Sequence, residues 1–409
     1  MPAASASTDH SLEQRLLLLA GVMQGVALVT FPAISTVLTS DSGYGLSSST
    51  YGLIFLPQVI AAISASILGG QLSRSWGVKK VLLLGLMADL ASMGVLLLSA
   101  IVMRQQAVAL PLLMTSTALM GLGFGGVVPA LNTLIANFQP LRVDAAILML
   151  NALLGLGTAL APALAALVVG PGIWWVLPLL VLLSAAILWY ACRRQPLQLQ
   201  SAGVDTTTHS APVKGSLPLL VLFLLVAVLY GLAETLNGNW SVILMSRRVG
   251  STEQIASLSL TLFWAMVTLG RLFFARFSTL FPPRRLLPGL PVFLAAIFLG
   301  ISRLTQGDSM AGLLLFGLSG FGCSAMLPAI ISLGQKRLVQ LGESTSGVLI
   351  AAYQFGYGLA AFGGGAVQQT WHLPISSLFS WGAATSLALA LAAGCIAVPG
   401  FLSGSRQAP

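Results

Sequence analysis

Long apolar stretches recur along the whole chain and are separated by short polar segments. A helix needs roughly 20 mostly apolar residues to cross the hydrocarbon core of a bilayer. Twelve stretches reach this length, and the sequence predicts a spanning helix in each of them: 14–38, 49–71, 79–103, 109–137, 143–170, 172–192, 216–243, 253–281, 285–304, 309–335, 344–370 and 373–398. The pattern therefore predicts an all-α membrane protein with twelve transmembrane helices.

One polar interruption, residues 193–215, is much longer than the others and is rich in Thr, Ser and Gln. It separates six predicted helices from six, so we expect an N-terminal half (1–192), a cytoplasmic linker (193–215) and a C-terminal half (216–409). The first apolar stretch exceeds the core of a cleaved signal peptide and ends without a small-residue cleavage site, so we expect a retained helix.

Composition supports lipid as the solvent of this chain. Of its residues 56% are hydrophobic and only 7% are charged, whereas soluble domains carry roughly 25% charged residues. The net charge of +9 could suggest nucleic acid, but the basic residues form short clusters between apolar stretches, as in membrane loops. We therefore expect the lipid bilayer, and no nucleic acid, as the partner surface.

The sequence gives no support to an enzyme, a metal site or a bound cofactor. Cys192, Cys323 and Cys395 lie far apart in apolar stretches, without a C-x-x-C spacing. The three histidines fall in a tail, the linker and a loop, and no nucleophile–base motif accompanies them.

The basic residues also predict how the chain is oriented. If the N-terminus is cytoplasmic, only Arg104, Arg247, Arg248 and Arg303 of the 19 Lys and Arg residues fall on the outer side. Cytoplasmic loops carry the excess of Lys and Arg. We therefore expect a multi-pass protein of the bacterial inner (cell) membrane, with both termini cytoplasmic, acting as a monomer.

The two halves share sequence landmarks about 200 residues apart. The pattern G-x-G-x-x-x-x-x-P-A begins at Gly121 and again at Gly320, 199 residues later. The pair Gly155 and Gly157 is matched by the pair that begins at Gly356, and a G-x-L segment leads to a basic loop in both halves. Glycine is common in membrane helices because it allows close backbone approach, but this does not explain the register shared with proline and the basic loops. We infer two six-helix pseudo-repeats.

The loop G-G-Q-L-S-R-S-W-G-V-K-K resembles the signature loop of the major facilitator superfamily. It departs from that signature, because Arg74 and Ser75 stand where the family has Asp and a basic residue. The resemblance covers nearly the whole chain. It implies a solute site near mid-membrane between two halves that rock against each other. The expected gating residues are Gly70, Arg74, Lys79, Lys80 and Asp144, the last of which could instead be a charge favourable to a helix N-terminus.

Four further motifs resemble the fucose–proton symporter branch of that family. They are A-L-N at 130–132, L-N-A-L-L-G-L-G-T-A-L-A-P at 150–162, Y-G-L-A-E-T-L-N-G-N-W at 230–240 and F-W-A-M-V-T-L-G-R-L at 263–272. The branch implies proton-coupled import of a sugar-like or other small polar solute, with an acidic residue in the seventh helix.

Two carboxyl groups are expected at membrane depth, Asp89 and Glu234. A charge there costs at least ~2.5 kcal/mol, so it must face water, a partner or a solute. Glu234 lies in the seventh predicted helix, which should line the central cavity, and we expect it to be the proton-coupling residue; a structural hydrogen bond to a neighbouring helix is the alternative. For Asp89, on a peripheral helix, we favour a structural role.

Neutral polar and aromatic side chains on seven predicted helices suit a sugar-like solute. The candidate substrate-binding residues are Gln24, Gln58, Asn132, Asn151, Asn237, Asn239, Trp240, Trp264, Tyr353, Gln354 and Tyr357. Bonding between helices is the alternative for each. No Lys or Arg is expected deep in the membrane, which argues against a phosphate or dicarboxylate carrier.

Two functions remain open at this point. The first is a proton-coupled importer of a small polar solute, which a cavity lined by amides would favour. The second is a proton-driven antiporter that exports drugs or amphipathic metabolites, which a mainly apolar cavity with one carboxylate would favour.

Overall fold

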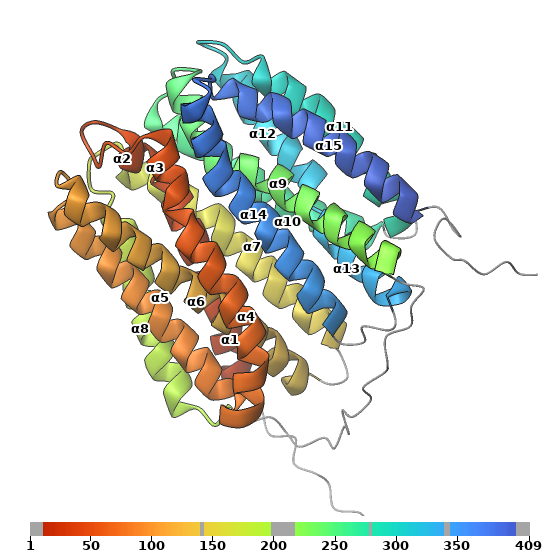
Figure 1. Cartoon of the computed structure of the whole chain (residues 1–409). Coiled ribbons are helices and arrows are strands. Elements are labelled where there is room, and N and C mark those ends of the chain that lie inside the picture. Colours follow the sequence, from red (N-terminus) through yellow and green to blue (C-terminus); the bar gives the residue numbers. More distant parts are fainter. Residues whose placement is uncertain (1–10, 140–142, 198–216, 278–279, 339–343, 398–409) are drawn as a thin grey trace, which may run out of the picture.

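The computed structural model describes residues 11–139, 143–197, 217–277, 280–338 and 344–397, and these residues form helices joined by short loops (Figure 1). The helices are α1 (Ser11–Ala33), α2 (Ser35–Thr39), α3 (Ser48–Leu53), α4 (Phe55–Trp76), α5 (Val78–Ile101), α6 (Gln106–Phe138), α7 (Val143–Val168), α8 (Val176–Arg194), α9 (Leu217–Arg247), α10 (Glu253–Arg276), α11 (Pro283–Ser302), α12 (Ser309–Cys323), α13 (Met326–Arg337), α14 (Ser344–Thr370) and α15 (Ser376–Ala397). The predicted linker lies mostly outside the described residues.

Eleven helical stretches in the described part of the chain are long and apolar enough to cross a membrane. The remaining predicted span, 344–370, corresponds to α14, whose 27 residues are long enough. It carries Tyr353, Gln354, Tyr357 and a run of glycines, which lower its hydropathy. The prediction of an all-helical membrane protein is thus confirmed.

Three predicted spans are broken helices, which corrects the prediction of one continuous helix in each. The span 14–38 is α1 followed by α2, the span 49–71 is α3 followed by α4, and the span 309–335 is α12 followed by α13. The second and third breaks lie just before Pro57 and Pro328, whereas the first follows Pro32, and there Ile34 N still donates to Thr30 O. Proline has no N–H and clashes with the carbonyl four residues earlier, so it interrupts the helix ladder.

Side chains bind backbone carbonyl groups at two of these breaks. Thr117 Oγ1 of α6 donates to Ile54 O at the α3–α4 break, at 2.5 Å. Arg271 Nε of α10 donates to Ser324 O at the α12–α13 break, at 3.3 Å. Ser324 lies four residues before Pro328, so its carbonyl is the one that the missing proline N–H would have served. Broken helices are tolerated inside membranes where side chains supply the lost bonds in this way.

Arg271→Met should therefore lower the thermal stability of the purified protein. The Ser324 carbonyl would lose a charge-assisted donor, and such a loss costs about 1–3 kcal/mol. Melting in detergent, followed by intrinsic tryptophan fluorescence, measures the effect. Arg276→Met is the matched control, because Arg276 is exposed at the end of the same helix. An equal loss of stability in both variants would contradict this role for Arg271.

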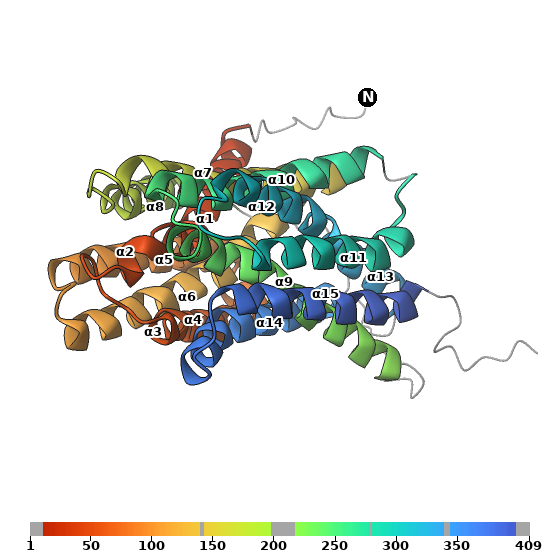
Figure 2. The same ribbon diagram turned by 90° about the horizontal axis from the view of Figure 1, so that it is seen from above.

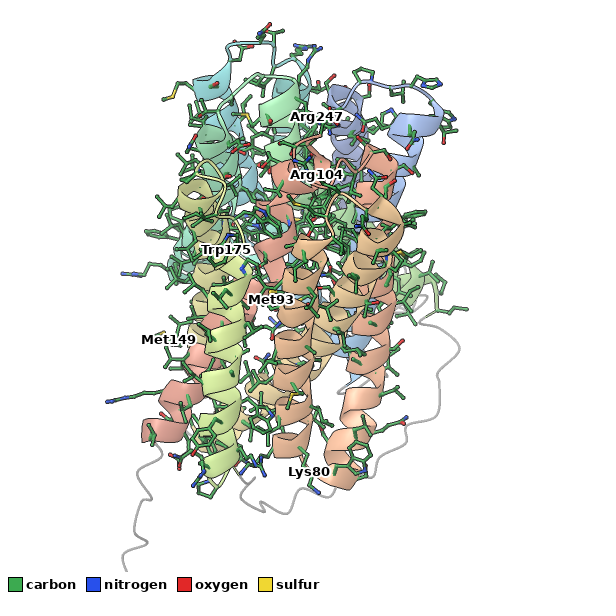
Figure 3. The ribbon with its side chains drawn as sticks, turned by 90° about the vertical axis from the view of Figure 1, so that its left-hand side faces the viewer. Lys80, Met93, Arg104, Met149, Trp175 and Arg247 are labelled. Atoms are coloured by element: carbon green, nitrogen blue, oxygen red, sulfur yellow. The ribbon has the colours of Figure 1, made fainter. Side chains whose placement is uncertain are left out.

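The helices run between two ends of the bundle. We call the end that holds Trp76, Arg194 and Leu217 the linker end, because the predicted linker joins α8 to α9 there. The other end, with Thr39, Arg247 and the loop after α5, is the loop end. Figure 3 shows Lys80 at the linker end and Arg104 and Arg247 at the loop end.

Corresponding glycines make the same close approach in the two sets of helices, α1–α8 (first half) and α9–α15 (second half). On α6, a Cβ added to Gly121 would lie 2.1 Å from Gln58 O of α4. On α12, a Cβ added to Gly320 would lie 2.1 Å from Phe263 O of α10. No side chain fits at such a distance, so glycine is required in both places.

A second pair of glycines, Gly157 and Gly356, behaves in the same way, and it corrects the predicted register, in which Gly155 corresponded to Gly356. A Cβ at Gly157 of α7 would lie 2.0 Å from Val22 O of α1. A Cβ at Gly356 of α14 would lie 2.1 Å from Val228 O of α9. The repeated glycines therefore hold equivalent helix pairs together, as expected for two pseudo-repeats.

The halves meet along two edges. Helix α7 packs on α10, and α3 and α4 pack on α14, while α1 and α2 contact α9 between these edges. Figure 2 shows α7 and α10 on one side of the bundle and α3, α4 and α14 on the other. Any space enclosed by α1, α4, α9, α10 and α14 thus lies between the halves.

Candidate functional site

A cavity of about 60 Å³ lies between the two halves. Its lining residues are Leu28, Val29 and Pro32 of α1, Gln58, Val59 and Ala62 of α4, Phe124 of α6, Glu234, Thr235, Gly238 and Asn239 of α9, Trp264 of α10, and Tyr353, Gln354 and Tyr357 of α14. This volume holds a few water molecules, and it is smaller than the ~300–1,000 Å³ typical of ligand pockets. An organic solute would therefore need the halves to move apart.

The cavity wall is chemically asymmetric. The first half contributes a mainly apolar wall, in which Gln58 is the polar member. The second half contributes a carboxyl group, two amides, a threonine and three polar-tipped aromatic rings. Helices α9 and α14, which carry most of these groups, pack directly on one another.

Glu234 is the carboxyl group of this wall, and it is only 3% exposed. Tyr230, one turn earlier on α9, donates to Glu234 Oε1 at 2.7 Å. Tyr353 of α14 donates to Glu234 Oε2. The two tyrosine rings stack, with centroids 5.7 Å apart and planes inclined by 29°. The carboxyl group is thus fixed by two hydroxyl groups from two helices rather than by a cation.

Several polar atoms of the cavity wall have no hydrogen-bond partner within the described part of the chain. They are Gln58 Oε1, Asn239 Nδ2 and Trp264 Nε1. One is an acceptor and two are donors. Buried polar groups are normally paired, so unpaired ones at a cavity are available to water or solute.

Gln24, a predicted substrate contact, lies outside this cavity wall. It is fully buried, and its Nε2 lies 3.5 Å from Asp89 Oδ1 of α5. Asp89 is also fully buried and lies against Gly123 of α6, where an added Cβ would be 1.9 Å from Asp89 Oδ1. These groups form a polar contact inside the first half.

Asn132 and Asn151 likewise lie away from the described cavity wall, towards the linker end. Asn132 Nδ2 donates to Val128 O of its own helix at 2.9 Å. Asn151 Nδ2 lies 3.4 Å from Asn132 Oδ1, a contact that joins α7 to α6.

Asn237 and Trp240 of α9 face neighbouring helices. Ser319 of α12 donates to Asn237 Oδ1 at 3.0 Å. Trp240 Nε1 donates to Ala360 O of α14 at 3.2 Å, and its ring meets Tyr51 of α3 edge to face at 5.5 Å. The structure therefore brings Glu234 together with Gln58, Trp264, Tyr353, Gln354 and Tyr357, and with Asn239, but not with Asn237 or Trp240.

Other lining residues, such as Thr235, Gly238 and Phe124, were not expected from the sequence. Thr235 and Gly238 lie within one turn of Glu234 on α9, so helical spacing could have indicated them. Phe124 sits within the repeated glycine motif of α6, and nothing in its sequence surroundings marks it as a cavity residue.

The predicted gating residues lie at the linker end. Lys79 Nζ donates to Arg193 O at 3.0 Å and to Gln195 O at 2.5 Å, so it caps the last turn of α8 in its own half. Lys80 is exposed. Gly70 belongs to α4, and the side chains of Arg74 and Asp144 lie outside the described residues.

The halves are joined above the cavity, at the loop end. Arg247 of α9 donates to Thr39 O at the end of α2, at 2.7 Å. Tyr51 of α3 donates to Asn239 O at 3.1 Å. The described structure is therefore closed across the loop end.

The loop-end closure also includes direct backbone contact between α3 and α14. A Cβ at Gly52 would lie 2.7 Å from Ala361 O. A Cβ at Gly365 would lie 2.0 Å from Ser48 O. Two glycines, one from each half, thus allow the closing helices to touch.

Comparisons with known proteins agree with this architecture. The Major Facilitator Superfamily profile matches residues 16–365. No curated protein matches the sequence significantly. Among solved structures, a D-xylose-proton symporter is similar with a TM-score of 0.74 and 15% identity, over 93% of this chain and 96% of that chain. The nucleoside transporter NupG is similar with a TM-score of 0.73 and 13% identity, over 94% and 98%.

The fucose:proton symporter FucP of E. coli is a further similar structure, 16% identical. In its outward conformation it gives a TM-score of 0.62 over 93% of this chain and 98% of that chain. The family match covers most of the sequence, so the chain belongs to the Major Facilitator Superfamily. It is a multi-pass membrane transporter with the fold of that family, rather than an enzyme.

Proposed function

We propose that this transporter is a proton-coupled symporter of a small, neutral, polar organic solute, working by alternating access across the bacterial inner membrane. The observation that supports this proposal most directly is the position of Glu234. It is a buried carboxyl group on the wall of the cavity between the halves, and it accepts hydrogen bonds from Tyr230 and Tyr353. In this proposal the protein acts as a monomer and both termini are cytoplasmic. The loop end then faces outwards, and the described state is the one that is closed on the outer side.

The proton step follows from the surroundings of Glu234. An ionised carboxyl group at membrane depth is costly unless it is hydrogen-bonded or hydrated. Both its oxygens accept from tyrosine hydroxyls here, which suits the ionised form. When the cavity closes and water leaves, the proton that neutralises Glu234 lowers this cost. Proton binding and the closure of the site are thereby linked.

The solute class follows from the rest of the wall. The residues lining the cavity include no Lys, Arg or His, so nothing there would balance an anionic solute. The amides Gln58, Asn239 and Gln354 and the Trp264 N–H offer donors and acceptors to hydroxyl groups. The similar structures named for D-xylose, fucose and nucleosides concern solutes rich in hydroxyl groups, which supports the same class here.

A proton-driven antiporter for amphipathic compounds is the second candidate. The observation that favours it is the apolar wall of the first half, formed by residues such as Leu28, Val59 and Phe124. The two candidates differ in the direction in which protons move when the compound moves.

Reconstitution into liposomes that contain a pH-sensitive dye separates the candidates. Thermal-shift screening of the purified protein against sugars, polyols, nucleosides and lipophilic cations selects the compounds to test. For a symporter, adding a bound sugar outside should acidify the lumen, because protons enter with it. Alkalinisation of the lumen as a lipophilic cation enters would favour the antiporter, and transport of a compound without any proton movement would overturn both.

A further inference from the structure

The break between α12 and α13 lies beside Glu234, and the hydroxyl group of Tyr230 lies between them. Tyr230 Oη is 2.7 Å from Glu234 Oε1 and 3.0 Å from Cys323 O, the carbonyl of the last residue of α12. A tyrosine hydroxyl has one hydrogen to donate. It can therefore serve the carboxyl group or the helix-end carbonyl fully, but not both at once.

We propose that Tyr230 is a positioning residue that transmits the protonation state of Glu234 to the α12–α13 break. When Glu234 is ionised, Tyr230 donates its hydrogen to Oε1. When Glu234 takes up a proton on Oε1, the new carboxyl O–H donates a hydrogen bond to Tyr230 Oη. The tyrosine O–H then turns and donates to Cys323 O. The inference rests on the proposed function, in which Glu234 is the proton-coupling residue.

The break is a place where such a change has mechanical consequences. Pro328 leaves Ser324 O without its helical N–H, and Arg271 occupies that carbonyl instead. The junction is thus held by side chains of α9 and α10 rather than by a continuous backbone ladder. Gaining or losing the hydrogen bond from Tyr230 changes how firmly the end of α12 is fixed. Helix α13 continues from there to the linker end, so its position depends on this junction.

The ionisable groups around Glu234 come from several helices. Helix α14 contributes Tyr353 and Tyr357, and α12 contributes the Cys323 thiol. Helix α10 contributes Arg271, which acts on Tyr353 and the Cys323 thiol over a longer distance. The lining residues of α1, α4 and α6 are uncharged. Tyr353 donates to Glu234 as Tyr230 does, but no bond from it to the α12–α13 break is described, which makes it the matched control.

The test uses the full-length protein in lipid nanodiscs and needs no solute. Spin labels on Ser75→Cys of α4 and Lys336→Cys of α13, both exposed near the linker end, report the distance between the halves as the pH is varied. The background carries Cys395→Ser, while Cys192 and Cys323 are buried. Infrared difference spectra of the carboxyl C=O band report the protonation of Glu234 itself in the same samples.

We expect the distance distribution to change with pH, with the same midpoint as the carboxyl band. The distance change and the titrating carboxyl band should both be absent in Glu234→Gln. Tyr230→Phe should keep the carboxyl titration and lose the distance change. Tyr353→Phe should keep the distance change with a moved midpoint. If Tyr230→Phe does not fold, Pro328→Ala should weaken the distance change and keep the titration, because it returns an N–H to Ser324 O.

A full distance change in folded Tyr230→Phe, or in Pro328→Ala where that variant replaces it, would overturn the relay and leave Glu234 as the proton site. An unaltered carboxyl band and an unaltered distance change in Glu234→Gln would overturn the proton site, and the relay with it. The two failures are therefore distinguishable.

Discussion

Gly365→Ala should slow transport roughly 5- to 150-fold while the protein still folds and inserts. The new Cβ would lie 2.0 Å from Ser48 O, so α14 could no longer seat against α3. Overpacking of this kind costs about 1–3 kcal/mol, which converts to that factor in the population of the loop-end-closed state. The protein would be biased towards the state that is open at the loop end.

The effect can be measured as solute exchange in proteoliposomes, together with labelling of a cysteine placed near the loop end. Gly363→Ala is the matched control, since nothing lies within 4 Å of a Cβ added at Gly363, two residues earlier on the same helix. Transport should be normal in the control and labelling should increase only in Gly365→Ala. Equal transport in both variants would show that contact between α3 and α14 is not part of the cycle.

Much of this fold could be predicted from the sequence because its strongest signals are one-dimensional. The length of each apolar stretch predicts a spanning helix. Glycines at corresponding positions of the two halves, such as Gly121 and Gly320, indicate which helices approach closely. The three breaks could not be placed in the same way. Proline is common in membrane helices and often only bends them; Pro129 of α6 lies inside a continuous helix, whereas its counterpart Pro328 lies beside a break.

The candidate site could be predicted only in part, for a physical reason. Membrane helices are apolar on all sides, so hydrophobic periodicity does not show which face points to the cavity. A charged or hydroxyl-bearing side chain is costly at membrane depth unless it has a polar partner. For this reason the sequence could single out Glu234, Tyr353 and Tyr357. Amides gave no such signal: Gln24 contacts Asp89 within the first half, whereas Gln58 lines the cavity.

The position of Arg271 was also difficult to interpret from the sequence alone. No Lys or Arg was expected deep in the membrane. In the structure the guanidinium group of Arg271 binds a backbone carbonyl at the α12–α13 break, close enough to influence the tyrosines around Glu234. A cation can thus lie beside the cavity without lining it, because a broken helix supplies the acceptor.

Glu234→Gln should abolish proton-driven accumulation and leave solute exchange in place. The amide keeps the size of the carboxyl group, and its oxygen can still accept a hydrogen bond from Tyr230 or Tyr353. It cannot take up and release a proton, so solute binding loses its link to the proton gradient. One proton crossing a one-unit pH gradient carries 1.36 kcal/mol, which supports at most about tenfold accumulation. The variant should therefore reach a ratio of about one.

Asp89→Asn is the control for this prediction, because Asp89 is a fully buried carboxyl group of the first half. Its neighbours are Gln24 and Gly123 of the first half rather than cavity groups, so accumulation should persist there even if stability falls. The measurement is uptake into proteoliposomes with and without an imposed pH gradient, beside equal-concentration exchange. Gradient-driven accumulation that survives in Glu234→Gln, or that disappears equally in Asp89→Asn, would contradict a coupling role confined to Glu234. Exchange that is lost together with accumulation would instead place Glu234 in solute binding, since a residue that serves only the proton is not needed for exchange at equal pH.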